Sequence, residues 1–499
     1  MWVKGVVGAQ ATPLGSQAMS AALRPDDALA HARSHWSTDV LPLLQTYAAI
    51  PGVSPAYDPD WEAHGLLSET ADLIAAWALD RHLPGATVEV VRIPGLTPTV
   101  VVDVPATDPG ATGTVLIYGH YDKQPPFDGW TAGRGPWAPV VEGEWIYARG
   151  VADDGYALPS ALLALEAVRA GGGRHARCVV LAEGSEESGS PHLRQVLTHL
   201  AEQIGTPDVV IALDSGSPTY ERLWVTTSLR GAIAGTLTVR VLEHGVHSGS
   251  AGAVVPSSFR IARLLLDRIE DPATGDLRLP ELRVDPPRGS LAAAEDLVRA
   301  RAGAGLEDSE FPVVDGLVLQ GESPAEQAVR VAWRGSVAVV GADGLPPTAD
   351  DGAVLLPFTS LKLVVRLPPT ADPDAAAEAL RRALTSDPPY GASVEWSAAP
   401  PAGGWSAPPL APWLAAALDD ASMACFDHPS GRLGEGGTIP FMGWLAAQFP
   451  AAQILALGVL GPGSNAHGPD EGLHMPTAER VTASLALLVD AHAGRDPGV

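Results

Sequence analysis

The sequence has few cysteines, few basic residues and no long apolar run, and each shortage excludes a class of protein. Two cysteines in 499 residues cannot build the disulfide framework of a small secreted protein, and they suit a reducing compartment. The 32 Lys and Arg residues face 58 Asp and Glu residues. The resulting net charge of −26 opposes binding to nucleic acid or to an anionic membrane surface.

Apolar stretches long enough for a membrane are also missing. No segment approaches the roughly 20 apolar residues of a membrane span. Residues 5–11 form an apolar patch that is too short for a signal peptide and is interrupted by glycine. We therefore expect a cytoplasmic protein with no nucleic-acid partner and no membrane partner.

What is present is the composition of an ordinary globular protein, in which apolar strands alternate with amphipathic helices. Residues 114–118, 178–182 and 209–213 have the strand pattern, and residues 157–169 have helical periodicity. Strands separated by helices at this spacing indicate a mostly parallel sheet with helices on its faces. The predicted fold class is therefore α/β.

From about residue 229 the pattern changes to alternating, half-exposed strands. Residues 232–242 and 360–367 have this pattern, and helical segments are expected at 256–269 and 373–384. Between them, one helical piece is expected near residues 292–302. Two strand–helix units of this kind suggest a small α+β domain with an antiparallel sheet.

Parallel-sheet character returns near the end of the chain, after a linker rich in proline and glycine. We therefore predict one discontinuous α/β domain, formed by residues 1–228 and 405–499. Residues 229–404 are expected to form a second domain inserted into it.

Histidine and acidic residues gather at the predicted strand ends. The set consists of His120, Asp122, Asp153, Asp154, Glu186, Glu187, Asp214 and His467. The acidic segment 183–189 taken alone could be a solvated turn, but its repetition at other strand ends favours a site. Nitrogen and oxygen donors without cysteine suit Zn²⁺, or else Mn²⁺ or Co²⁺. Two histidines and three carboxylates suffice for two ions if one carboxylate bridges them, an arrangement used for hydrolysis.

Six motifs in this order resemble the M20 metallopeptidase family, and the match covers nearly the whole chain. They are GHYD at 119–122, ADDG at 152–155, EGSEESGS at 183–190, DSG at 214–216, GVHSG at 245–249 and NAHGPDE at 465–471. Segments 221–231 and 435–440 are most similar to the carnosinase-type, or cytosolic nonspecific, dipeptidases. The resemblance implies a zinc-peptidase-like sheet and an inserted lid and dimerisation domain.

The resemblance also implies a role for each metal-site residue. His120 and Asp214 would bind one ion, Glu187 and His467 the other, and Asp153 would bridge the two. Asp122 would hold the imidazole of His120 in the required tautomer. Glu186 would be the general base, and the peptide bond between Asp153 and Asp154 would be cis.

Substrate-binding roles follow from the same resemblance. His247 would reach the partner subunit's site in a homodimer and stabilise the oxyanion. Arg366 would grip the substrate carboxylate, and Gly437 and Thr438 would lie at the same end of the pocket. Glu471 would contact the substrate.

Four positions depart from the family pattern. Lys123 stands where valine is usual, Gly155 where lysine is usual, and Gly434 where arginine is common. Val340–Gly341 replaces an Asn-Gly pair. None of these positions is a predicted ligand or the base, so they bear on the substrate more than on the metals.

The sequence therefore predicts a cytoplasmic, homodimeric, dimetal hydrolase that cleaves the amide bond of dipeptides, with Zn²⁺ as the expected ion. One alternative is an amidohydrolase of N-acyl or N-carbamoyl amino acids, or a desuccinylase. Another is a metal-binding dimer without catalysis, which has no need of a base at Glu186.

Overall fold

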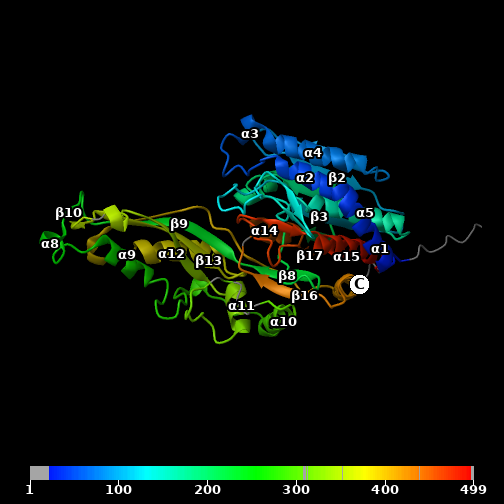
Figure 1. Cartoon of the computed structure of the whole chain (residues 1–499). Helices are drawn as coiled ribbons and strands as arrows, with labels where there is room; N and C mark the ends of the chain where they lie inside the picture. Colours follow the sequence, from blue (N-terminus) through cyan, green and yellow to red (C-terminus); the bar gives the residue numbers. More distant parts are fainter. Residues whose placement is uncertain (1–21, 307–310, 312, 351, 438, 496–499) are drawn as a thin grey trace, which may run out of the picture.

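A nine-stranded sheet organises the main part of the molecule (Figure 1). The computed structural model describes residues 22–306, 311, 313–350, 352–437 and 439–495. The strand order is β1-β2-β6-β3-β7-β17-β8-β15, and β16 pairs with β8. The strands are β1 (Thr87–Val91), β2 (Thr99–Val104), β3 (Thr114–His120), β6 (Arg177–Glu183), β7 (Val209–Ala212), β8 (Trp224–Leu229), β15 (Trp405–Ser406), β16 (Gly431–Glu435) and β17 (Gln453–Ala456).

The four central strands of this sheet are parallel. β6, β3, β7 and β17 pair side by side in one direction, whereas β1, β2 and β15 join antiparallel at the edges. Almost every residue of the central strands is buried, because runs of Val, Ile and Leu are covered on both faces. The carboxyl ends of these strands meet at one edge, and the predicted α/β class is confirmed.

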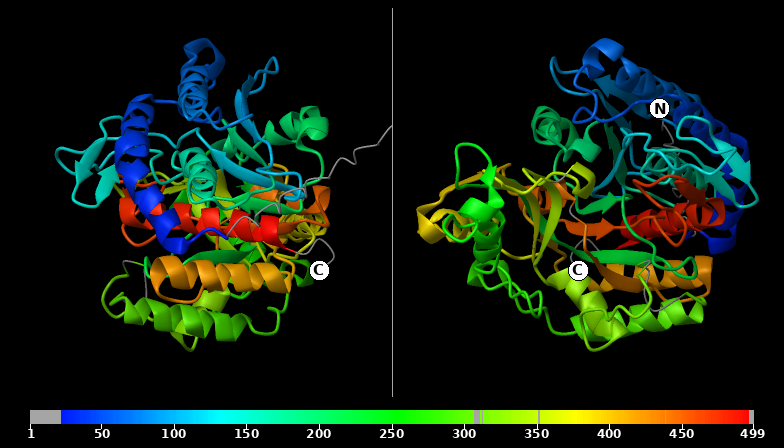
Figure 2. Two further views of the ribbon diagram at one scale, coloured as in Figure 1. Left: turned by 90° about the vertical axis from the view of Figure 1, so that its right-hand side faces the viewer. Right: turned by 60° about the vertical axis from the view of Figure 1, so that its left-hand side comes forward.

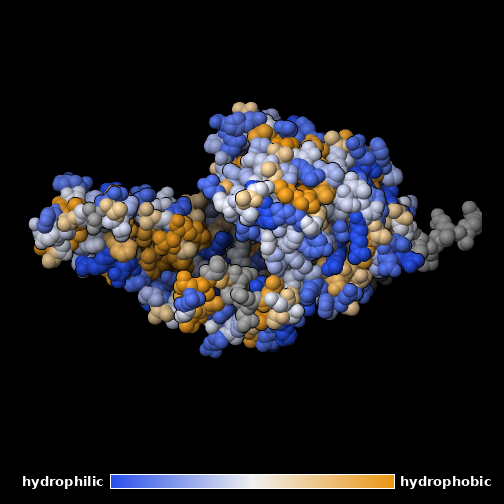
Figure 3. Space-filling model, viewed as in Figure 1, coloured by the Kyte–Doolittle hydropathy of each residue, from blue (hydrophilic) through white to orange (hydrophobic). Residues whose placement is uncertain are grey.

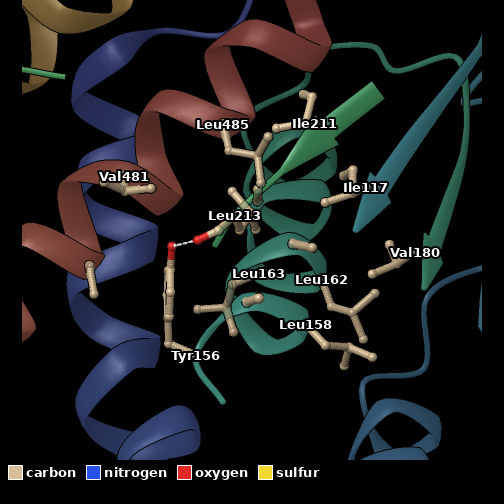
Figure 4. Packing of buried hydrophobic residues seen from close by; sticks show 14 of the residues in the cluster. Ile117, Tyr156, Leu158, Leu162, Leu163, Val180, Ile211, Leu213, Val481 and Leu485 are labelled. Carbon is tan, nitrogen blue, oxygen red and sulfur yellow. Dashed lines mark hydrogen bonds between the residues drawn. The ribbon is translucent and has the colours of Figure 1, made fainter. Parts of the chain in front are cut away.

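Helices cover both faces of the main sheet (Figure 2). One face carries α1 (Pro25–His35), α2 (Leu41–Ala49), α4 (Leu66–Asp80), α5 (Ala157–Ala170), α13 (Pro412–Phe426) and α15 (Met475–Gly494). The other carries α6 (Leu193–His199), α7 (Ala201–Ile204) and α14 (Pro440–Gln448). Helix α5 is rich in alanine and leucine and is buried on nearly all sides, against the sheet and α15 (Figure 4). This packing fixes the turn before α5, which carries a predicted ligand.

The inserted domain has its own antiparallel sheet, in the order β11-β13-β9-β14. Its strands are β9 (Gly231–Arg240), β11 (Ser336–Asp343), β13 (Phe358–Leu367) and β14 (Ser393–Ala398). Burial alternates along β9, and α9 (Ser258–Leu266) and α12 (Pro373–Thr385) cover the buried face. The inserted α+β fold is thus confirmed. At the far end of this domain lie β10 (Val246–His247), β12 (Val354–Leu355) and α8 (Ser248–Ala251) (Figure 1).

Two helices between α9 and β11 pack on the main sheet instead of the inserted one. These helices, α10 (Ser290–Gly303) and α11 (Pro324–Trp333), contact each other and β16. The sequence predicted a helix only near 292–302, and α11 was missed. Its start has a recognisable signal, since the Ser323 hydroxyl caps the amide of Glu326 and Pro324 begins the helix.

Short elements complete the described chain. They are α3 (Trp61–His64), β4 (Val140–Glu142), β5 (Trp145–Tyr147) and β18 (Gly472–His474). Among the described residues, no helix combines the length and apolar character needed to cross a bilayer. Cys178 and Cys425 are both buried and free.

Candidate metal centre

The carboxyl edge of the central strands brings most of the predicted ligands together. His120 ends β3, Asp214 follows β7 by two residues, and Glu187 lies in the turn after β6. His467 belongs to the loop after β17, and Asp153 to the turn before α5. Five segments that are distant in the sequence therefore meet at one place.

Two groups of ligand atoms share Asp153. In the first, His120 Nε2 lies 3.1 Å from Asp153 Oδ1 and 3.9 Å from Asp214 Oδ2. In the second, His467 Nε2 lies 3.0 Å from Asp153 Oδ2 and 3.3 Å from Glu187 Oε2. Within each group all ligand atoms lie within 4.8 Å of one another. The arrangement fits two neighbouring cations with Asp153 between them.

The electrostatics of the cluster also fit cations. Burial, followed by repulsion from Asp153, raises the pKa of Asp214 to about 7. The same two causes raise the pKa of Glu187 above its ordinary value. For Asp153 burial alone would raise the pKa, but its contacts with His120 and His467 lower it. Buried carboxylates that repel one another are stabilised by divalent ions, and the nitrogen and oxygen donors suit Zn²⁺.

Asp122 connects a ligand to the turn that holds the predicted base. Nδ1 of His120 lies 3.2 Å from the Asp122 carbonyl oxygen and 3.5 Å from its carboxylate. The two carboxylate oxygens accept hydrogen bonds from the amides of Glu186 and Glu187, each at 3.0 Å. Asp122 therefore lies where it can orient the imidazole, and it also fixes the acidic turn.

Glu186 lies beside the ligands and belongs to neither ligand group of the described residues. Burial, followed by the charge of Asp214, raises the pKa of its carboxyl above the ordinary value. A raised pKa makes a carboxylate a stronger proton acceptor, which suits a general base.

Glu471 has a different environment from the one expected of a substrate contact. It is fully buried, and its carboxylate accepts hydrogen bonds from Arg149 Nη1 at 2.8 Å and from the amides of Gly150, Ala152 and Asp153 at 3.0–3.2 Å. These partners occupy both oxygens. The predicted substrate contact is therefore corrected: Glu471 ties the His467 loop to the turn that carries Asp153. The Asp153–Asp154 peptide bond in this turn is cis, as expected.

Two departures from the family pattern lie against one aromatic ring. A Cβ atom at Gly155 would come within 2.3 Å of the Tyr47 ring, so only glycine leaves room for it. Lys123 is fully buried, with Nζ 3.9 Å from the centroid of the same ring, and it donates to the carbonyls of Tyr47 and Ile50 at 2.7 Å. Lys123 thus fixes the end of α2 under the metal centre.

The next residue, Tyr156, supports a ligand strand. It is fully buried, and its hydroxyl donates to the carbonyl of Leu213, directly before Asp214 (Figure 4). This bond connects the start of α5 with the end of β7. No local sequence pattern indicates this contact, because it joins residues that are distant in the chain.

Arg366, the predicted partner of the substrate carboxylate, lies in the inserted sheet beside the first residues of β9. Arg366 is half-buried on β13 and faces Ala232 of β9 in register. Burial, followed by the charge of Arg366, lowers the pKa of Arg230 to about 10. Ser336 of β11 pairs in register with Arg366, and its hydroxyl lies 3.4 Å from Arg230 Nη1. Arg230 also donates its amide to the Gly437 carbonyl at 3.0 Å. Gly437 is exposed, and Thr438 lies outside the described residues.

Glu435 lies beside the candidate ligands, and sequence reasoning did not select it. Its Oε1 accepts hydrogen bonds from the Ser215 hydroxyl at 2.8 Å and the Gly216 amide at 3.2 Å. These donors directly follow Asp214, so the carboxylate lies beside a ligand. The EGG motif at 435–437 could have indicated Glu435, but the sequence analysis selected only Gly437 from these three residues.

His247 is not brought to the metal centre of its own chain. It lies on β10, exposed, at the end of the inserted domain that projects away from the main sheet (Figure 1). Any catalytic role must therefore be exerted on another molecule.

The raised pKa values predict how the metal-free protein responds to pH. The pKa of Asp214 is raised from 3.8 to about 7, so protonation of this group favours the folded state. We expect the free energy of unfolding to fall as pH rises through this window, by an amount on the order of a few kcal/mol. Urea unfolding of chelator-treated protein at about pH 5 and about pH 8 measures this change. A constant or rising stability would contradict it, whereas metal-loaded protein should gain stability with pH because its ligands must be deprotonated.

Comparison with known proteins identifies a peptidase family and a dipeptidase relative. The sequence profile described as Peptidase family M20/M25/M40 matches residues 116–491. The cysteinylglycine-S-conjugate dipeptidase of Corynebacterium striatum is 28% identical over 385 residues, which cover 76% of this chain and 80% of that protein.

Two solved structures have a similar fold. One is the di-peptidase Dug1p from Saccharomyces cerevisiae, with a TM-score of 0.74 and 20% identity over 94% of this chain and 99% of that chain. The other is human carnosine dipeptidase 1, with a TM-score of 0.74 and 19% identity over 94% of this chain and 99% of that chain. At this level of identity the likeness concerns the fold.

Proposed function

Because the chain belongs to peptidase family M20/M25/M40, we propose that it is a dimetal-dependent dipeptidase with Glu186 as its general base. The observation that carries the proposal is the pair of ligand groups that share Asp153, with Glu186 beside them. We also propose Zn²⁺ as the native ion and the cytoplasm as the location. The nitrogen and oxygen donors of the predicted ligands support Zn²⁺. The acidic, cysteine-poor sequence supports the cytoplasm.

The residues divide the work of amide hydrolysis among them. When bound, two divalent ions would supply Lewis acidity and would lower the pKa of the attacking water. Glu186 removes a proton from the attacking water and later delivers it to the leaving amine. Asp122 holds the amide of Glu186 at 3.0 Å and thereby fixes the base relative to His120.

The substrate's two charged ends have candidate partners. Glu435 is a half-buried carboxylate beside Asp214, and it suits the free ammonium group of a dipeptide. Arg366 suits the terminal carboxylate, through the planar fork of its guanidinium group. A partner for a free ammonium favours dipeptides over N-acylated substrates.

The first experiment is hydrolysis of a dipeptide panel and its N-acetylated counterparts by metal-free protein reconstituted with Zn²⁺, Mn²⁺ or Co²⁺. We expect cleavage of the free dipeptides alone. Glu435→Gln should lower kcat/KM for them by about 10–100-fold, the worth of a charge-assisted hydrogen bond. Cleavage of blocked substrates alone would support the N-acyl amidohydrolase, and no cleavage with metal bound would support the non-catalytic dimer.

We further propose that the protein is a homodimer formed through the inserted domain. Strand β11 is an edge of the inserted sheet, and its Val339 and Val340 are 51% and 60% exposed. A long apolar edge strand is a surface that proteins usually cover. The remote position of His247 also supports a dimer, because only another molecule can receive it.

Mixing two inactive variants tests the role of His247 across this interface. His247→Ala and Glu186→Ala should each be inactive, and a reassembled mixture should regain activity because one site of each heterodimer is complete. Random exchange makes half the dimers mixed, so about a quarter of wild-type activity is expected. No recovery in a mixture that mass spectrometry shows to contain heterodimers would place His247 outside the partner's site.

A further inference from the structure

A large cavity opens beside the metal centre and is lined in part by the hairpin of α10 and α11. The space-filling view shows that the molecule is hollowed where the inserted domain meets the main part (Figure 3). Its volume is about 820 Å³, within the range of about 300–1,000 Å³ for pockets that enclose drug-sized ligands. Residues 216–218, which follow Asp214, form one side. Residues 460–466, which precede His467, form another. The cavity therefore begins at the loops that carry metal ligands.

The wall opposite these loops is largely apolar and comes from the hairpin. Leu297 and Val298 of α10 and Val331 of α11 line it, and Leu433 continues the surface onto β16. Arg301 also lines the cavity and already interacts within the protein. An apolar wall gains free energy when an apolar group displaces water from it, in proportion to the area covered.

Two glycines of the cavity floor allow α11 to approach this closely. A Cβ atom at Gly434 would lie 2.6 Å from the Cβ of Ala332. One at Gly436 would lie 3.1 Å from Val331 Cγ1. The arginine that is common in the family at position 434 would not fit beside α11. The glycine at position 434 is therefore what allows the hairpin to lie in this place.

Helix α10 is also fixed to the main sheet. Arg222 Nη1 donates to Asp296 Oδ2 of α10 at 2.9 Å. Leu297 packs against the cluster formed by Trp224, Ala300 and Leu433. Helices α10 and α11 are thus held on β16 of the main sheet (Figure 1).

We propose that this cavity binds the side chain of the substrate's N-terminal residue and selects large apolar side chains. The inference rests on the dipeptidase function proposed above. Glu435 lines the cavity next to the metal centre, and it is the residue to which we assign the substrate's ammonium group. The ammonium group and the N-terminal side chain are attached to the same carbon atom. Binding of one at Glu435 therefore directs the other along the hairpin wall.

Two homologous series of dipeptides test the proposal. The first varies the N-terminal residue before glycine from alanine through norvaline and norleucine to 2-aminooctanoic acid, and the second places the same residues after glycine. We expect kcat/KM in the first series to rise by about fourfold for each buried methylene. The second series should show no such rise, because its variable side chain lies on the other side of the scissile bond.

Variants of the hairpin locate the effect. Val298→Trp and Val331→Trp, on different helices, should each abolish the rise with chain length by filling the cavity. Leu291→Trp is the matched control, because Leu291 is 53% exposed on the same α10 and does not line the cavity. It should keep the wild-type rise. Circular dichroism and metal content would identify a variant that fails to fold. If one of the two cavity variants does not fold, the other still tests the proposal.

The outcomes separate this inference from the function on which it rests. Equal kcat/KM along the first series, with all its members cleaved, overturns the pocket and leaves the dipeptidase intact. An equal rise in both series overturns the assignment to the N-terminal residue. Failure to cleave any dipeptide overturns the function and the pocket together.

Discussion

Replacement of Glu186 by glutamine is expected to lower kcat by about 10²–10⁴-fold, the usual contribution of a general base. Glutamine has nearly the same shape but cannot accept the proton of the attacking water. The metal content should stay the same, because Glu186 belongs to neither ligand group of the described residues. The measurements are steady-state kinetics on a free dipeptide and the number of bound ions per chain.

The neighbouring residue provides the matched control. Glu187 Oε2 lies 3.3 Å from His467 Nε2, inside the second ligand group. Glu187→Gln should therefore lose one ion per chain and regain part of its activity when excess metal is supplied. A near-normal kcat in Glu186→Gln, or loss of metal from this variant, would show that the proposed roles of the two carboxylates are wrong.

The central strands were predictable because their sequences leave few alternatives. β3, β6 and β7 consist of short runs of apolar residues that the helices cover on both faces. β16 reads GRLGE and has no such run, and it is a strand because it pairs with β8. α11 has a start signal at Ser323 and Pro324, but its place is determined by packing on β16. Sequence patterns thus identify the elements that are buried on all sides, and tertiary pairing decides the others.

The grouping of the candidate ligands was predictable from the same logic. Each predicted ligand lies at or just after a strand end or in a loop at the sheet's carboxyl edge, so a one-dimensional pattern was sufficient to suggest that they meet. The roles of Glu471 and Glu435 depend on contacts across more than 200 residues, with Arg149 and Ser215 respectively. No local pattern carries that information.

Replacement of Glu471 by glutamine is expected to destabilise the protein strongly. It would leave the guanidinium group of Arg149 buried without its counter-charge, and loss of one partner of a buried ion pair costs about 3–5 kcal/mol. Urea unfolding measures the loss. Glu142→Gln is the matched control, because Glu142 pairs with Arg134 at the exposed surface, and its replacement should change stability little.

The same substitution distinguishes the two roles considered for Glu471. The Glu471 carboxylate accepts hydrogen bonds from the amides of Gly150, Ala152 and Asp153, in the turn that carries one predicted ligand. Glu471 itself lies in the same loop as His467, another predicted ligand. If it positions this turn, Glu471→Gln should weaken binding of the second ion by about 10–100-fold, as losses of residues that orient metal ligands do. Calorimetric titration of metal-free protein measures this affinity directly. Wild-type stability and metal affinity combined with a raised KM would instead restore the substrate contact expected from the sequence. The enclosed carboxylate predicts the first result, because a side chain whose oxygens are taken by Arg149 and three amides has no acceptor left for a ligand.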